Sequence, residues 1–142
     1  MTDIAGSISG LRFYKAAANT GTHVASLWDA NGTLLAQSTF ASESTSGWQQ
    51  VSFPTPVAVT ANHLYIASYH TPTGHVADDK WFSTLPPEFF EPTGFDAAPL
   101  HMVSGAGPSG PNDVYAISST STFPTQASLD ENYWVDVVFN SS

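Results

Sequence analysis

Hydrophobic and polar residues alternate in short runs along the first half of the chain, and turn signals separate these runs. The clearest runs are residues 8–15, 23–28 and 33–40, with Asn19-Thr20-Gly21 and Asn31-Gly32 between them. Alternation with a period of two is typical of strands that bury one face, and Asn-Gly suits the positive φ angles of a type I′ hairpin turn. The pattern therefore predicts antiparallel strands joined by short turns.

Further strand signals continue to the C-terminus. They lie at residues 48–53, 57–59, 64–70, 114–117 and 132–139. No stretch carries a convincing helical period. The predicted fold is therefore all-β, an antiparallel two-sheet β-sandwich of jelly-roll type with about eight strands.

The strand predicted at residues 48–53 shows how its two faces differ. Val51 and Phe53 fall on one face, whereas Trp48 and Gln50 fall on the other. We expect the prolines that follow Phe53 to end this strand, because proline cannot donate a hydrogen bond to a neighbouring strand.

Residues 71–113 break the strand pattern. This stretch of roughly forty residues is long for a loop in a compact domain, and such loops are usually functional or disordered. It is rich in Pro and Gly but holds five large aromatic residues, Trp81, Phe82, Phe89, Phe90 and Phe95. These rings either plug one end of the sandwich, the more common situation for large aromatic residues, or form an exposed ligand platform.

Composition and charge narrow the possible partners. The 142 residues are 42% hydrophobic and suit a single domain, 1–142. The chain has three Lys and Arg residues in total and twelve Asp and Glu residues, which gives a net charge of -9. This deficit of cations excludes binding to nucleic acid and argues against an anionic membrane surface. Neutral glycans and calcium remain compatible with such a chain.

Several segments together resemble the family known as domain of unknown function 4082. They include Gly-Leu-Arg-Phe-Tyr-Lys at 10–15, Asn-Thr-Gly-Thr-His at 19–23, Leu-Trp at 27–28, and the segments 47–51, 56–62, 65–70 and 132–139. The resemblance implies a module of large secreted bacterial proteins, often joined to glycoside hydrolases or immunoglobulin-like domains. We therefore expect an extracellular fragment of a larger exported protein, with neighbouring domains as partners.

The resemblance also implies one more strand before residues 10–15, which is missing or truncated here. We expect its absence to leave an open sheet edge, where another chain could pair by strand addition. Strand-mediated self-association is one form of such pairing.

Aromatic and amide side chains are the candidates for glycan binding. Sugars stack their C–H faces on aromatic rings, while amides and carboxylates bind their hydroxyl groups. The residues that suit this chemistry are Trp81, Trp48, Trp28, Gln50, Asp78 and Asp79. Buried tryptophans that merely close the ends of the sandwich are the alternative.

Histidines and one carboxylate are the candidates for metal binding. His23, His70 and His75 could converge at one end of the sandwich and bind zinc or copper, or each could bond a loop backbone group instead. Asp136 is unusual in the apolar final strand. It either faces solvent, the favoured interpretation, or serves a hydrogen-bond network or a cation such as structural Ca²⁺.

The leading functional hypothesis is a non-catalytic, carbohydrate-binding-like accessory module. No Gly-x-Ser-x-Gly motif is present, and Glu88 and Glu91 are expected to be solvated loop charges rather than paired catalytic carboxylates. One alternative is a structural or adhesive docking module that binds no small ligand. Another is an enzyme built on the three histidines.

Overall fold

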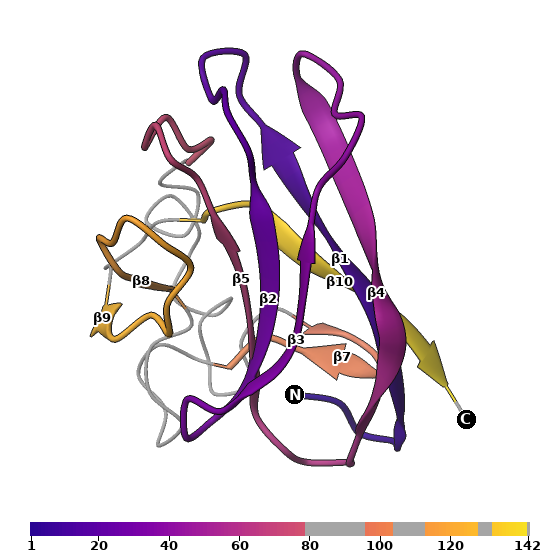
Figure 1. The fold of residues 1–142 in the computed structure, drawn as a ribbon. Coiled ribbons are helices and arrows are strands. Elements are labelled where there is room, and N and C mark those ends of the chain that lie inside the picture. Colours follow the sequence, from indigo (N-terminus) through magenta and orange to yellow (C-terminus); the bar gives the residue numbers. More distant parts are fainter. Residues whose placement is uncertain (79–95, 104–112, 128–131, 142) are drawn as a thin grey trace.

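The computed structural model describes residues 1–78, 96–103, 113–127 and 132–141. Within these residues the chain forms ten β-strands and no helix, and every strand pairing is antiparallel (Figure 1). None of the described segments is a helix long and apolar enough to cross a membrane. The all-β prediction is confirmed, while the finer assignment to a two-sheet sandwich of jelly-roll type stays a prediction.

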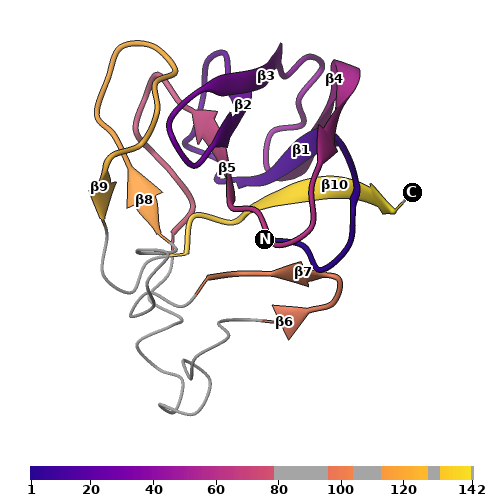
Figure 2. The ribbon, with the colours of Figure 1, turned by 90° about the horizontal axis from the view of Figure 1, so that it is seen from below.

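Two three-stranded sheets form the body of the described structure. One has the order β10-β1-β4 and the other β3-β2-β5, and Figure 2 shows them as two layers. Their bounds are β1 (Gly6–Lys15), β2 (Val24–Asp29), β3 (Leu34–Thr39), β4 (Gly47–Val59), β5 (Tyr65–His70) and β10 (Val135–Ser141).

Two small hairpins complete the described strands. Strand β6 (Asp96–Ala97) pairs with β7 (Leu100–His101), and β8 (Val114–Tyr115) pairs with β9 (Gln126–Ala127). In both ribbon views β8 and β9 lie beside β5 (Figures 1 and 2). Strands β6 and β7 therefore lie within the region predicted as one long loop, whereas β8 falls in the strand predicted at residues 114–117.

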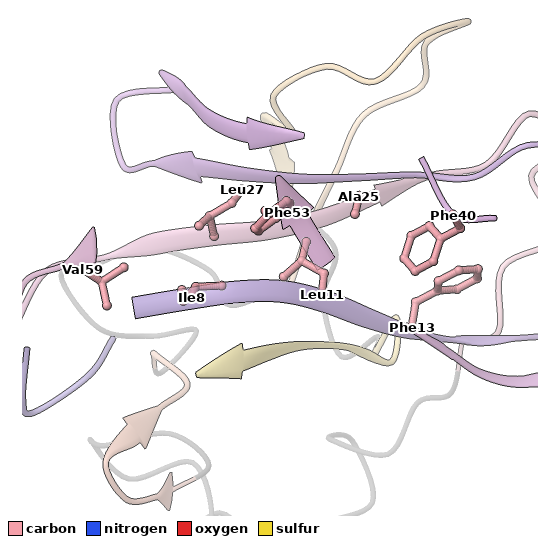
Figure 3. Close-up of a cluster of buried hydrophobic side chains, with 8 residues drawn as sticks. All are labelled: Ile8, Leu11, Phe13, Ala25, Leu27, Phe40, Phe53 and Val59. Atoms are coloured by element: carbon pink, nitrogen blue, oxygen red, sulfur yellow. The ribbon is translucent and has the colours of Figure 1, made fainter. Parts of the chain in front are cut away.

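One hydrophobic cluster is shared by the two three-stranded sheets. Its buried members are Ile8, Leu11, Phe13, Ala25, Leu27, Phe40, Phe53 and Val59 (Figure 3). The ring of Phe13 is fully buried, lies edge-on to Phe40 at 4.8 Å and stacks on Tyr69 at 4.3 Å. Alternation along β1 points both Leu11 and Phe13 into this cluster.

Strand β4 continues through both prolines that were expected to end it, so that prediction is wrong. The predicted strands 48–53 and 57–59 form one strand of 13 residues. The β1–β4 register shifts between Ile8 and Gly10, which leaves residues 53–56 opposite Ser9 alone. Proline is tolerated in this irregular section of an edge strand because no ladder hydrogen bond is needed there.

The hairpin between β2 and β3 is confirmed, but not as a type I′ turn. Of its loop residues only Gly32 has a positive φ, of 85°, whereas Asn31 does not. The side chain of Asp29 stabilises the turn instead, because its Oδ1 accepts hydrogen bonds from the backbone N–H groups of Asn31 and Thr33, each at 2.8 Å.

The open sheet edge expected beside β1 is not found. Strand β1 is the central strand of its sheet and pairs with β4 on one side and β10 on the other. The residues before it also pair, because Thr2 bridges to Leu100 and the Asp3 N–H donates to the Pro99 carbonyl at 2.9 Å. The sequence could not show that the C-terminal strand lies beside β1.

Candidate functional site

The outer face of sheet β10-β1-β4 carries exposed aromatic and polar side chains. Because Leu11 and Phe13 point into the core (Figure 3), the intervening Arg12 and Tyr14 point to the opposite face. Both are exposed, as are Trp48 and Gln50 on the neighbouring strand β4. The prediction that Trp48 and Gln50 share an outward face is therefore confirmed.

Strand register arranges these side chains in two rows across the sheet. In the first row Arg12 lies between Gln50 and Asp136, and in the second Tyr14 lies opposite Trp48. Trp134 extends the second row, because its carbonyl accepts the Tyr14 N–H at 3.0 Å. We call this set of six residues the outer platform: Arg12, Tyr14, Trp48, Gln50, Trp134 and Asp136.

Three aromatic rings of the outer platform contact one another edge to face. The Trp48 ring centre lies 5.8 Å from that of Tyr14 and 6.4 Å from that of Trp134, with interplanar angles of 88° and 80°. Trp48 is 47% exposed and Tyr14 41%. Because the rings are almost perpendicular, they form a stepped surface rather than one flat plane.

The backbone of Trp134 is strained. Its φ of 47° lies in the left-handed region, which bulky residues rarely adopt. The Asn132 side chain supports this conformation, because its Oδ1 accepts the Trp134 N–H at 2.9 Å. Strain of this kind persists where the surroundings enforce it and is often found at functional sites.

The outer platform neutralises its own charges. The Arg12 Nε and Nη2 groups donate to Asp136 Oδ2 at 2.8 and 2.5 Å, and the guanidinium lies 5.0 Å from the centre of the Trp48 ring. The other carboxylate oxygen of Asp136 accepts the Val137 N–H at 2.8 Å. Asp136 therefore faces the solvent side of the sheet, as the favoured interpretation predicts, and both of its carboxylate oxygens accept hydrogen bonds there.

Trp28 is not part of this site, so its prediction as a ligand-binding residue is wrong. It is 6% exposed, donates its Nε1–H to Ser68 Oγ at 2.9 Å and packs edge-on against Phe123 at 5.7 Å. The outer face of β2 is covered by the segment around Phe123, because Ser121 also bonds to Ser26 at 2.8 Å. A burial of this kind depends on a remote segment that strand alternation does not reveal.

Asp78, another predicted ligand residue, does not join the outer platform. Asp78 is exposed and lies at the wall of a separate cavity beside β5. Trp81 and Asp79 lie outside the described residues, and so do Glu88 and Glu91.

The three predicted metal-binding histidines do not form a metal site. Both ring nitrogens of His23 are engaged by Glu43 and Asn19. His70 Nε2 lies 3.2 Å from the Ser118 carbonyl, to which it donates, and His75 is exposed. Among the described residues, no group of three His, Cys, Asp or Glu side chains is placed to hold a metal ion.

His23 instead belongs to a buried polar cluster at one end of the core. Its Nδ1 lies 2.9 Å from both oxygens of Glu43, and the Lys15 ammonium donates to the same carboxylate at 2.7 Å. On the other side His23 Nε2 lies 2.9 Å from Asn19 Oδ1, which also accepts the Thr71 hydroxyl. The cluster thus ties the end of β1 to the loops before β4 and after β5.

The polar cluster predicts how stability depends on pH. Burial alone would raise the pKa of Glu43, but hydrogen bonds from Lys15 and His23 outweigh it and lower that pKa below its ordinary value of 4.5. A lowered carboxyl pKa adds stability above the ordinary value, and this contribution is lost as the pH falls through the folded-state pKa. Hydrogen bonds from the Thr33 and Asn31 backbone lower the pKa of Asp29 in the same direction.

We therefore expect the free energy of unfolding to fall as the pH drops below about 4.5. Urea unfolding between neutral and acidic pH measures this decline. In a Glu43→Gln variant the decline should be shallower, because the contribution of the Glu43 carboxyl group is absent. An equally steep decline in that variant would contradict the assignment to Glu43.

The sequence did not identify Tyr14, Arg12 or Trp134 as members of the site. A signal was present, since Arg12 and Tyr14 alternate with buried residues, and Trp134 and Asp136 share one face of the final strand. The sequence pattern did not show that the final strand, β10, pairs with β1 and so brings these residues onto one face.

The described part of the chain is an antiparallel β-structure with an aromatic and polar platform on one sheet face. The model of the family described as Domain of unknown function (DUF4082) matches residues 1–135, and the chain belongs to this family. Neither a search of the curated proteins nor a search of the solved structures found a match.

Proposed function

We propose that this chain is a non-catalytic module that binds neutral polysaccharide through the outer platform. The observation that carries the proposal is the exposure of Trp48 and Tyr14 beside the Gln50 amide. Exposed rings stack on the C–H faces of sugars, and amide groups exchange hydrogen bonds with sugar hydroxyls. Large aromatic side chains are otherwise mostly removed from water, so their gathering on one sheet face favours a ligand.

The electrostatics of the outer platform favour a neutral ligand. Its only cation, Arg12, is bound to its only carboxylate, Asp136, and lies against Trp48. An anionic polysaccharide would compete with Asp136 for Arg12 and would meet a chain of net charge -9. The stepped arrangement of the rings suits a single flexible glycan chain better than a flat crystalline surface.

We also propose a jelly-roll-like sandwich architecture and an extracellular role beside other domains. Two three-stranded sheets with a common core support the architecture. The family resemblance supports the role as an accessory module, and the charge deficit supports a partner other than nucleic acid or membrane.

Affinity gel electrophoresis against a panel of soluble polysaccharides tests the proposal. Neutral glucans, mannans, xylans and galactans should include at least one that retards the folded chain, whereas alginate and polygalacturonate should not. Retardation should be the same with calcium and with chelator, because Asp136 is bound to Arg12. No retardation by any neutral polymer would count against the glycan-binding role and favour a docking module.

A further inference from the structure

A cavity beside β5 is separate from the outer platform. It lies between β5, the segment around β8 and the beginning of β10, and has a volume of about 570 Å³. This is within the range of roughly 300–1,000 Å³ that is typical of small-molecule sites. No residue of the outer platform lines it.

Tyr69 in the wall of this cavity carries a hydroxyl group with no hydrogen-bond partner among the described residues. Its ring is held in place by stacking on Phe13 at 4.3 Å, with 21° between the ring planes. A buried hydroxyl group without a partner costs free energy that a phenylalanine at the same position would avoid. Packing alone therefore does not explain why this position holds a tyrosine rather than a phenylalanine.

The surroundings of Tyr69 keep its hydroxyl group neutral. Burial raises the pKa of Tyr69, and the nearby Asp78 and Tyr133 raise it further. Both of these neighbours line the cavity, as Tyr69 itself does. A neutral phenol can donate one hydrogen bond and accept others.

The rest of the wall combines apolar and hydroxyl-bearing side chains. Ala67, Val114 and Val135 supply apolar surface, Tyr115 adds an aromatic ring, and Thr120 adds a hydroxyl group. No lysine or arginine is among the described residues of the wall, which argues against an anionic ligand. Such a mixture fits a molecule with C–H faces and several hydroxyl groups.

We propose that this cavity is a second binding site, for a compact neutral polyol of monosaccharide or disaccharide size, with the Tyr69 hydroxyl group as a hydrogen-bond partner. The ligand would occupy a partly enclosed cavity suited to one sugar unit or a chain end, whereas the outer platform would contact a chain along its length. The inference does not depend on the outer platform, because the two sites share no residue.

Isothermal titration calorimetry and saturation-transfer NMR with methyl glycosides of glucose, galactose, mannose and N-acetylglucosamine test this proposal. At least one should bind saturably at concentrations up to about 10 mM. Tyr69→Phe should weaken that binding about tenfold or more, since it removes one hydrogen bond and leaves the ring in place. Its thermal unfolding should be unchanged or shifted upward.

Tyr65→Phe is the matched control. Tyr65 lies on the same strand and its hydroxyl group accepts the Thr60 N–H at 3.0 Å, but it does not line this cavity. This variant should bind like the wild type. Thr120→Trp, at an exposed position of the wall, should block the site even if Tyr69→Phe alters folding.

Tetramethylammonium serves as a cationic probe, because Asp78 and three tyrosines could instead attract an organic cation. Tight binding of this probe that disappears in Asp78→Asn would overturn the polyol proposal. So would the absence of saturable glycoside binding, or equal glycoside affinity in Tyr69→Phe. A Trp48→Ala variant should keep its glycoside binding, which separates failure of this site from failure of the outer platform.

Discussion

Replacing Glu43 by alanine should lower the free energy of unfolding by about 3–5 kcal/mol, since breaking one side of a buried ion pair leaves the other charge uncompensated. The Lys15 and Glu43 side chains are each only 10% exposed, and His23 is fully buried. Without the carboxylate, the Lys15 ammonium and the His23 Nδ1 would both lose their acceptor. Urea unfolding followed by circular dichroism at neutral pH measures the loss.

A matched control compares the same chemistry at an exposed position. The Arg12–Asp136 pair has side chains that are 46% and 38% exposed, so Asp136→Ala should cost no more than about 1 kcal/mol. A double variant, Lys15→Met with Glu43→Leu, should recover only the part of the loss that comes from the unpaired Lys15 charge, because His23 Nδ1 still lacks its acceptor. A Glu43→Ala loss as small as that of Asp136→Ala would show that solvent reaches the polar cluster.

Trp48→Ala should lower the affinity for the bound neutral polysaccharide by about tenfold to a hundredfold. This range corresponds to a loss of about 1.4–2.8 kcal/mol, within what a central aromatic contact contributes to binding. Trp48 contacts both other rings of the outer platform and the Arg12 guanidinium. Its removal would therefore also release the side chains that shape the surface.

Leu34→Ala controls for the loss of an exposed apolar side chain. Leu34 is 44% exposed, similar to Trp48, but it lies on β3 in the other three-stranded sheet. Affinity gel electrophoresis of both variants, with urea unfolding to confirm that each is folded, gives the comparison. Equal loss of affinity in the two variants, or none in Trp48→Ala, would remove the outer platform from the binding site.

Local sequence patterns predicted most strands because alternation and turn residues act over a few neighbouring positions. They predicted the separation of Val51 and Phe53 from the outward Trp48 and Gln50. They predicted β4 to be too short, because proline normally ends a strand and β4 continues through two prolines. Opposite these prolines the register between β1 and β4 shifts, so the prolines break no regular pairing. Local patterns could not show this, because β1 lies more than thirty residues before β4 in the chain.

Contacts between distant residues explain why only part of the site was predicted. Trp28 and Trp48 both stand on strands, and their sequence contexts do not tell them apart. Phe123 covers Trp28, whereas nothing in the described structure covers Trp48 to the same degree. Trp134 reaches Trp48 only because β10 lies beside β1 and the Trp134 backbone adopts a positive φ.

The metal-binding alternative for the histidines failed for a related reason, whereas His70 bonds a loop carbonyl as the other alternative predicts. His23 lies four residues after Asn19 and twenty before Glu43, and all three side chains meet in the folded chain. A histidine with a buried carboxylate and amide on its two nitrogens has no lone pair left for a metal ion. Sequence spacing does not show which polar groups will satisfy a histidine.

Two-dimensional ¹H–¹⁵N NMR of the four tryptophan indole groups tests the central claim most directly. The chain is titrated with a soluble oligosaccharide of the neutral polymer it binds, and the indole signals are assigned from single Trp→Phe variants. The Trp48 and Trp134 signals should shift saturably, while the Trp28 signal, from an indole bonded to Ser68 in the interior, should stay in place. A saturable shift of the Trp81 signal, with Trp48 and Trp134 unmoved, would contradict the assignment of glycan binding to the outer platform.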